Sequence, residues 1–219
     1  MPVTFAVSTL EDAMEAIKKI PQELGYFVLK DRYGYGCGEQ VHLLEFEDPE
    51  LEALITMYIS SYNYILLQEF CPEVKDGDLV VTFFDQELLA PLHRVAGWGE
   101  WKTNFCKGGN QRYFTLTSEQ ESIARTVINA FPECRFASVD MLPSGKVLEI
   151  NAFPGGKGLL EIYGISVGNI IMDRMEKEIL GRPLRPSPSY DYALSPHMGA
   201  REDIKKLYEK FAPSVEVFD

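Results

Sequence analysis

The sequence has few of the features that mark membrane-spanning, secreted or nucleic-acid-binding proteins. Its 219 residues include 21 basic side chains against 33 acidic ones, so the formal net charge is −12. A negative field of this size repels phosphate backbones and argues against nonspecific nucleic-acid binding. No apolar run reaches the roughly 18 residues of a membrane span. The N-terminus lacks the basic start and the apolar stretch of a signal peptide.

Paired cysteines and clustered histidines are also lacking. Cys37, Cys71, Cys106 and Cys134 are isolated, with no C-x-x-C pair, and the three histidines are equally scattered. Free thiols without a signal peptide predict a reducing compartment, the cytoplasm, and disfavour both a disulfide framework and a zinc site. Apolar residues make up 46% of the chain, which is enough for a packed core.

Hydrophobic spacing and turn residues predict a mixture of helices and strands. A helix should begin at Ser8, with Glu11 completing a capping box, and should end at Pro21. Further helices are predicted over 50–59, 117–131 and 167–180, and strands over 26–30, 41–46, 64–70, 79–84, 87–95, 135–142 and 146–150. Beyond Arg182 the chain is rich in proline, with one mostly polar helix candidate over 200–211. We expect this tail to pack on the body or on a neighbouring subunit.

Three oxygen-bearing side chains lie on two strands joined by a tight turn. Glu149 and Asn151 are two residues apart and therefore project from one face of their strand, while Asp140 can join them from the neighbouring strand. Two carboxylates and an amide oxygen suit Mg²⁺ that holds nucleotide phosphates. The alternative is an exposed polar face of a half-buried hairpin.

Three other segments could contact a nucleotide. Lys30 ends a buried strand before a glycine-rich loop that includes Gly36 and Gly38, where a lysine and close backbone N–H groups could bind phosphate. The alternative is a flexible hairpin tip. Because this loop joins two strands, it does not fit a Rossmann or Walker phosphate loop. The strand end at 68–70 could offer backbone groups to adenine, although such patterns are common.

The third segment is the loop over 100–109, which holds two lysines, an amide and a glycine pair. Lys102, Asn104 and Lys107 could organise around an anion such as a phosphoryl group. With Arg94 they could reverse the negative field locally. The alternative is an ordinary polar loop with packed tryptophan.

Taken in order, these segments resemble the ATP-grasp superfamily, in particular the glutathione synthetase and RimK-like ligases. The resemblance covers about residues 1–180, and its most specific part is Val139-Asp140 followed by Glu149-Ile150-Asn151-Ala152-Phe153-Pro154-Gly155. It implies an α+β protein with the ATP-grasp fold, in which two lobes with antiparallel sheets clasp the nucleotide. The lobes would be 1–70, with the glycine-rich loop, and 71–181, with the metal site, followed by the extension 182–219.

The resemblance also implies roles for individual residues. The nucleotide would be bound by Lys30, Gly36, Gly38, Gln68, Glu69, Phe70, Asp78 and Lys107. Two Mg²⁺ ions, or Mn²⁺, would be held by Asp140, Glu149 and Asn151. The catalytic groups would be Arg94, Lys102 and Asn104. The implied reaction joins a small-molecule carboxylate to an amine through an acyl phosphate, and releases ADP and phosphate.

The sequence departs from the family pattern at three points. Val80 stands where members usually carry arginine, and Arg94 is the candidate to compensate for it. Lys102 and Lys107 replace arginines, which keeps the charge but loses the bidentate geometry. From the extent of the resemblance we expect the family's N-terminal domain to be missing, in which case a homo-oligomer or a separate chain could supply it. The alternative function is therefore a non-catalytic nucleotide-binding subunit or a degenerate ATP-grasp module that needs a partner chain.

Overall fold

The computed structural model describes residues 1–31, 38–103 and 109–180. The chain forms two compact units. The first comprises Met1–Gly77, Val95–Asn110 and Lys146–Leu148, and the second comprises Asp78–Arg94, Gln111–Gly145 and the residues from Glu149 onward. The lobe boundaries expected at residues 70 and 181 stay predictions.

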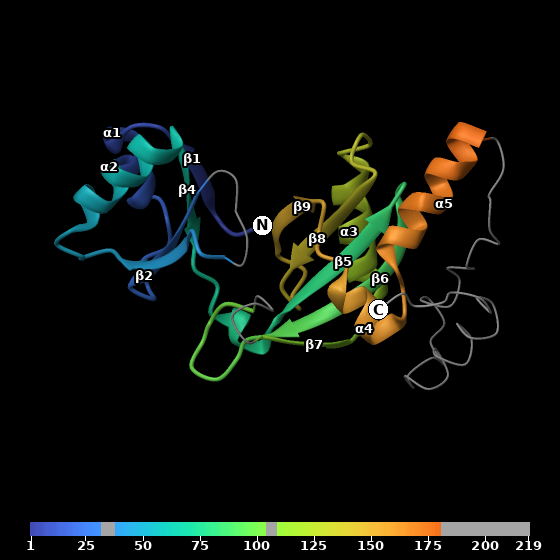
Figure 1. Ribbon diagram of the computed structural model, residues 1–219. Coiled ribbons are helices and arrows are strands. Elements are labelled where there is room, and N and C mark those ends of the chain that lie inside the picture. The colour runs from blue at the N-terminus through green and yellow to red at the C-terminus, as the bar shows by residue number, and fades with distance from the viewer. Residues whose placement is uncertain (32–37, 104–108, 181–219) are drawn as a thin grey trace, which may run out of the picture. The chain divides into compact units, whose positions relative to one another are not determined.

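The first unit is a four-stranded antiparallel sheet in the order β1-β4-β2-β3, with two helices packed on it (Figure 1). Its elements are β1 (Thr4–Val7), α1 (Leu10–Ile17), β2 (Tyr26–Asp31), β3 (Val41–Glu45), α2 (Leu51–Tyr62), β4 (Ile65–Glu69) and the 3-10 helix η1 (Pro72–Asp76).

Side-chain alternation along β2 separates the two faces of this sheet. Phe27 and Leu29 are fully buried against Ile17 of α1 and Ile55 of α2, so Lys30 projects from the face opposite the helices. Helix α1 begins one residue later than expected. Thr9, not Ser8, is the N-cap, and its hydroxyl accepts from the Asp12 N–H at 3.1 Å.

The second unit is built on a five-stranded sheet in the order β7-β6-β5-β8-β9. Its elements are β5 (Asp78–Phe84), β6 (Glu87–Val95), β7 (Asn110–Tyr113), α3 (Ser118–Asn129), β8 (Phe136–Met141), β9 (Val147–Ala152), α4 (Lys157–Tyr163) and α5 (Val167–Leu180). The expected strands are confirmed within a few residues at each end, whereas β1, β7 and α4 were not predicted.

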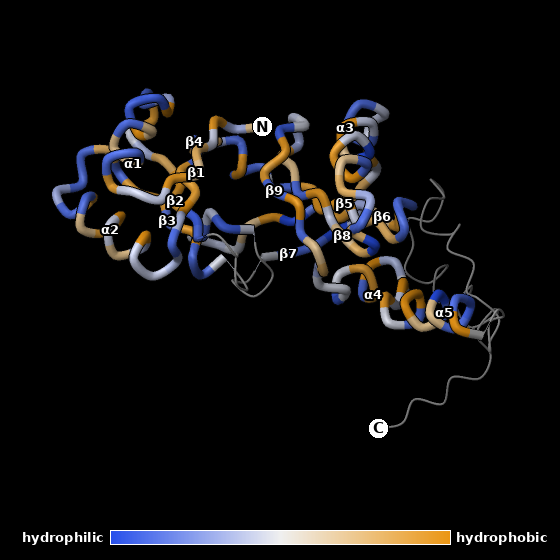
Figure 2. The backbone as a smooth tube through the Cα atoms, turned by 90° about the horizontal axis from the view of Figure 1, so that it is seen from above, coloured by the Kyte–Doolittle hydropathy of each residue, from blue (hydrophilic) through white to orange (hydrophobic). Residues whose placement is uncertain are grey.

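Helices cover both faces of this second sheet (Figure 2). Helix α3 packs against β8, and its first turn is fixed by a capping box in which Thr117 and Gln120 bond reciprocally. On the other side, Leu159 and Ile170 from α4 and α5 join Val80 in one buried apolar cluster. None of the described helices combines the length and the apolar character that a membrane crossing requires.

Candidate functional site

Strand register brings the acidic candidates of the second unit to one face of its sheet. Asp78 of β5 lies opposite Arg94 of β6, and Val80 of β5 lies opposite Asp140 of β8. Because side chains two apart share a face, Asp78, Arg94 and Asp140 all project to the same side. β9, which carries Glu149, is the next strand beyond β8. The strand order thus gathers the predicted metal ligands around Asp140.

Arg94 bridges two buried carboxylates across β5. Its Nε donates to Asp78 Oδ1 at 2.9 Å, and its terminal nitrogen Nη2 donates both to Asp78 Oδ2 and, at 2.7 Å, to Asp140 Oδ2. The side chains of Asp78 and Asp140 are 4% and 1% exposed, and that of Arg94 is 16% exposed. Buried acids require such a partner, since an unpaired charge in the interior is costly. Arg94 therefore supplies a cation on the same face as Val80, but from the position opposite Asp78, two residues along β5 from the expected arginine.

Asp140 receives two more hydrogen bonds. Ser138, two residues earlier on the same face of β8, donates its hydroxyl to Asp140 Oδ1 at 2.8 Å. The Asn151 amide Nδ2 lies 3.3 Å from Asp140 Oδ2 and 3.0 Å from Glu149 Oε1. The structure thus brings the Asp140 and Glu149 carboxylates within hydrogen-bonding distance of the Asn151 amide, as the spacing in the sequence suggested.

The electrostatics of this cluster are dominated by burial. Burial raises the pKa of Asp140 to about 6, the positive charge of Arg94 opposes that rise, and the negative charges of Glu149 and Asp78 add to it. For Arg94, burial lowers the guanidinium pKa, but the surrounding carboxylates outweigh it and the pKa lies above its usual value. Arg94 therefore stays charged.

The donor set fits magnesium chemically. The carboxylates of Asp78, Asp140 and Glu149 and the guanidinium of Arg94 carry a formal net charge of two negative, which one Mg²⁺ neutralises. Turning the Asn151 amide by half a rotation would present Oδ1 as a third oxygen ligand. Within the described residues, no group of three or more His, Cys, Asp and Glu side chains is arranged to hold a metal ion. The candidate site accordingly depends on the amide as well as the acids.

In the first unit, Lys30 and Gln68 lie on the sheet face opposite α1 and α2. Val28 pairs with Gln68, and Lys30 pairs with Leu66, so both polar side chains project from this face. The Gln68 amide nitrogen donates to the Thr4 hydroxyl at 2.9 Å, which ties β4 to β1. The side chain of Gln68 is thus engaged within the sheet, and its proposed contact with adenine would fall to backbone groups.

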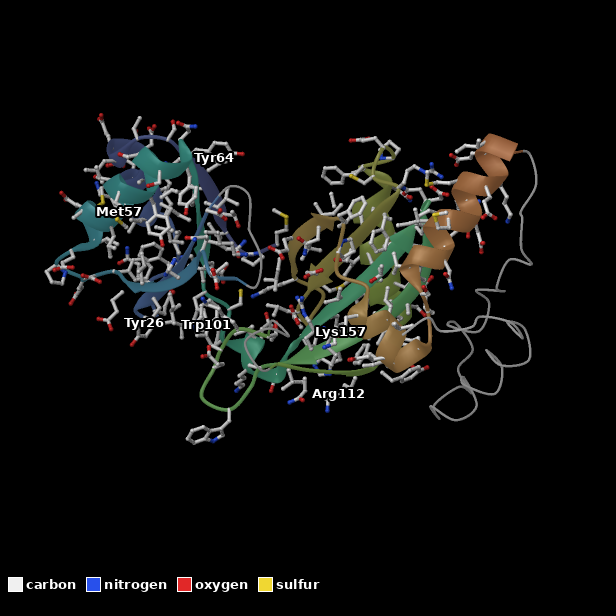
Figure 3. The ribbon with its side chains drawn as sticks, in the orientation of Figure 1. Tyr26, Met57, Tyr64, Trp101, Arg112 and Lys157 are labelled. Atoms are coloured by element: carbon white, nitrogen blue, oxygen red, sulfur yellow. The ribbon has the colours of Figure 1, made fainter. Side chains whose placement is uncertain are left out.

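The end of β4 is fixed by its neighbours. Glu69 Oε2 accepts from the Val3 N–H at 3.0 Å, so this acid already caps the start of the N-terminal strand. Phe70 contacts Trp101 edge to face, with ring centroids 6.0 Å apart (Trp101 is labelled in Figure 3). These contacts position the backbone at 68–70, the segment proposed to contact adenine.

Lys102 lies in the first unit together with the glycine-rich segment. Its Nζ donates to the Gly38 carbonyl at 2.7 Å, so the loop after β6 is tied to the hairpin between β2 and β3. Gly36, Asn104 and Lys107 lie outside the described residues. Arg94, in contrast, belongs to the second unit, where it pairs with acids.

Sequence reasoning missed two parts of this arrangement. Ser138 was not singled out, although its position two residues before Asp140 already placed it on the same face. The pairing of Arg94 with Asp78 depends on the register between β5 and β6. The short turn at Asp85 and Gln86 alone would place Asp78 opposite His93, but a bulge between Thr82 and Phe83 shifts the register by one residue and brings Asp78 opposite Arg94.

Comparison with known proteins places the chain in a family. The profile of the ATP-grasp domain of prokaryotic glutathione synthetase matches residues 1–163. A probable alpha-L-glutamate ligase of Shewanella halifaxensis is 28% identical over 131 residues, which are 58% of this chain and 28% of that protein. One from Methanococcoides burtonii is 26% identical over 181 residues, which are 81% of this chain and 58% of that protein.

Solved structures agree on the fold. The ATP-grasp ligase PsnB, complexed with minimal precursor, Mg and ADP, superimposes with a TM-score of 0.53 at 17% identity, covering 80% of this chain and 52% of that one. This likeness confirms the α+β ATP-grasp architecture. The chain spans little more than half the length of PsnB, and between 28% and 58% of the two ligases. Because the family profile covers residues 1–163 of 219, the chain belongs to the family of the prokaryotic glutathione synthetase ATP-grasp domain.

Proposed function

We propose that the chain binds ATP with magnesium and uses it to join a carboxylate to an amine. The observation that carries the proposal is the convergence of Asp140, Glu149 and Asn151 beside the buried Arg94. A cluster with two net negative charges is a poor site for phosphate alone and a good one for a divalent cation. Membership in the ATP-grasp family supports the nucleotide as the second component.

Each unit would contribute its own groups to this activity. In the second unit, Asp140, Glu149 and Asn151 would hold magnesium, one or two ions, with Mn²⁺ as a substitute. When bound, the metal supplies positive charge that neutralises the phosphates. Arg94 and Ser138 hold the Asp140 carboxylate in place. In the first unit, Lys30 would contact phosphate, and the backbone at 68–70 would contact adenine.

The proposed reaction balances without an oxidant or reductant. An oxygen of the substrate carboxylate bonds to the γ-phosphorus as the bond to the bridging oxygen breaks, so ADP leaves. The amine nitrogen then bonds to the acyl carbon, and phosphate departs with the electron pair of the broken C–O bond, while the amine proton passes to solvent. Lys102 and Arg94 would neutralise developing negative charge, and Asn104 would help to orient the acyl group.

Calorimetric titration of the full chain with ATP in magnesium buffer tests the binding step. Glu149→Gln should weaken binding at least about tenfold, because one charged ligand carries roughly 1.4 kcal/mol or more in such a site. Glu87→Gln is the matched control, since Glu87 is an exposed acid of the same unit that pairs with Arg174. Equal affinities for wild type, Glu149→Gln and the control would contradict the proposed metal site.

A phosphate-release screen over pairs of carboxylates and amines tests the reaction itself, with Glu149→Gln as the blank. Release should require both substrates. The alternative, a non-catalytic nucleotide-binding module, is favoured by Val80, and predicts tight Mg·ATP binding with no release for any pair. A second copy of the chain or a separate chain could contribute to the acceptor site. Measurement of the molecular mass in solution with and without Mg·ATP tests whether such a complex forms.

A further inference from the structure

Helix α5 presents an apolar face that the described residues of its unit leave exposed. One side of the helix is buried, with Ile170 in the cluster shared with α4 and with Asp173 only 2% exposed. On the other side Met172 and Met175 are each 46% exposed, and Ile179 is 72% exposed. A surface helix of a globular protein normally carries polar residues on its outer face.

The exposed residues form a narrow stripe and are not scattered singly. Gly168, Met172, Met175 and Ile179 follow one another at intervals of four, three and four residues. At 100° per residue this set falls within an arc of roughly 60°, the width of a coiled-coil seam. A contiguous apolar stripe of this kind marks a surface that another helix can cover.

The same spacing recurs in the C-terminal segment, outside the described residues. Ala200, Ile204, Leu207 and Phe211 also follow at intervals of four, three and four, and the positions between them are mostly charged. Each stripe spans 12 residues (168–179 and 200–211), or about 18 Å of helix. A helix this short is marginal alone in water and requires a packing partner.

We propose that residues 200–211 form a helix that docks its apolar stripe onto the Met172–Ile179 face of α5 in the same chain. The two seams match in spacing and length. The connection over 181–199 has 19 residues, which is ample to return the segment along α5 in either direction. A tether of this length gives an effective concentration on the order of millimolar, far above that of a second copy in a micromolar solution. This inference goes beyond the proposed function and is independent of it.

Hydrogen exchange followed by mass spectrometry on the full chain tests the docking. In wild type at micromolar concentration, backbone amides of 200–211 should exchange at least about tenfold more slowly than the unstructured rate. The protection should disappear both in Met172→Glu/Met175→Glu and in Ile204→Glu/Leu207→Glu. Met57→Glu is the matched control, because Met57 is 53% exposed on α2 of the other unit (Figure 3) and should leave the protection intact.

Three outcomes would overturn the proposal. The first is exchange of 200–211 at the unstructured rate in wild type. The second is protection that persists in the α5 variant while protection elsewhere shows that variant to be folded. The third is protection that grows with protein concentration together with a doubled mass in light scattering, which would place the segment on a second copy. Because none of these readouts involves nucleotide, their result is separate from that of the calorimetric test.

Discussion

Replacing Arg94 by methionine removes the cation from a buried cluster while keeping most of the side-chain volume. Asp78 then loses both of its hydrogen bonds to the guanidinium, and Asp140 loses one. Removing one partner of a buried ion pair typically costs about 3–5 kcal/mol, because the remaining charge is left desolvated and unpaired. For a protein of this size each kcal/mol lowers the melting temperature by roughly 2–4 °C. We therefore expect a fall of between about 6 and 20 °C.

Arg135→Met provides a matched control. Arg135 also donates two hydrogen bonds to one aspartate, Asp85, and others to a second acid, Glu178. The difference is burial, since the side chain of Arg135 is 48% exposed and that of Arg94 is 16% exposed. Water replaces the lost partner at the surface, so the control should change the melting temperature far less. Thermal melts followed by circular dichroism in a chelator-containing buffer measure both.

The cost of Arg94→Met should also depend on pH. Arg94 lowers the pKa of Asp140, which burial raises to about 6, so removing Arg94 raises that pKa further. As pH falls toward 5, Asp140 of the native variant binds a proton. In the unfolded chain an aspartate has a pKa of about 3.9 and stays deprotonated at this pH, so proton binding stabilises the native state. The gap between variant and wild type should thus be wide at pH 8 and narrow at pH 5. A melting temperature for Arg94→Met no lower than that of Arg135→Met, or a gap that widens on acidification, would refute the reasoning.

Burial lowers the pKa of His42, and the positive charge of Lys102 adds to this effect. The imidazole therefore binds a proton more readily in the unfolded chain than in the native state. The stability that His42 confers should be lost as pH falls below about 6.5. The difference in unfolding free energy between wild type and His42→Asn should shrink from pH 8 to pH 5, and a constant difference would count against this. Gly145 has φ +84° and an added Cβ would lie 2.7 Å from Ile123 Cδ1, so Gly145→Ala should cost about 1–2 kcal/mol in urea unfolding. Gly155→Ala, where no atom lies within 4 Å, should be neutral, and equal effects would disprove the steric argument. The buried Tyr163 hydroxyl donates to the Pro91 carbonyl and accepts from the Phe114 N–H, so Tyr163→Phe should destabilise the second unit by about 1–2 kcal/mol in the same urea assay, and an unchanged midpoint would show these bonds to be unimportant.

The sequence predicted those parts of the fold that local patterns determine. The hairpin around Asp85 and Gln86 follows from two apolar runs with a tight turn between them, and the structure has β5 and β6 there. The approach of Asp140 to Glu149 and Asn151 could be foreseen because a short turn allows little freedom of register between β8 and β9.

The parts that were missed depend on tertiary contacts. Strand β7 has the sequence Asn-Gln-Arg-Tyr, which has no apolar alternation, and it is a strand because it pairs with β6. Helix α4 begins with Lys157-Gly158, a poor helix start, and a Cβ added at Gly158 would meet the ends of the Leu92 and Gln111 side chains. The N-cap of α1 is Thr9 and not the predicted Ser8. Either hydroxyl suits that position, and sequence patterns do not define a helix end to a single residue.

The guanidinium between Asp78 and Asp140 allows folding to proceed without metal binding, whereas many metal proteins combine the two. In domains whose ligands repel one another without their ion, the ion completes folding, and a chelator unfolds the chain. Here a guanidinium of the same polypeptide already pairs with two buried acids, Asp78 and Asp140. The fold therefore does not depend on an ion to balance these two acids. Under the proposed function, a transient fall in free magnesium would weaken nucleotide binding without unfolding the chain.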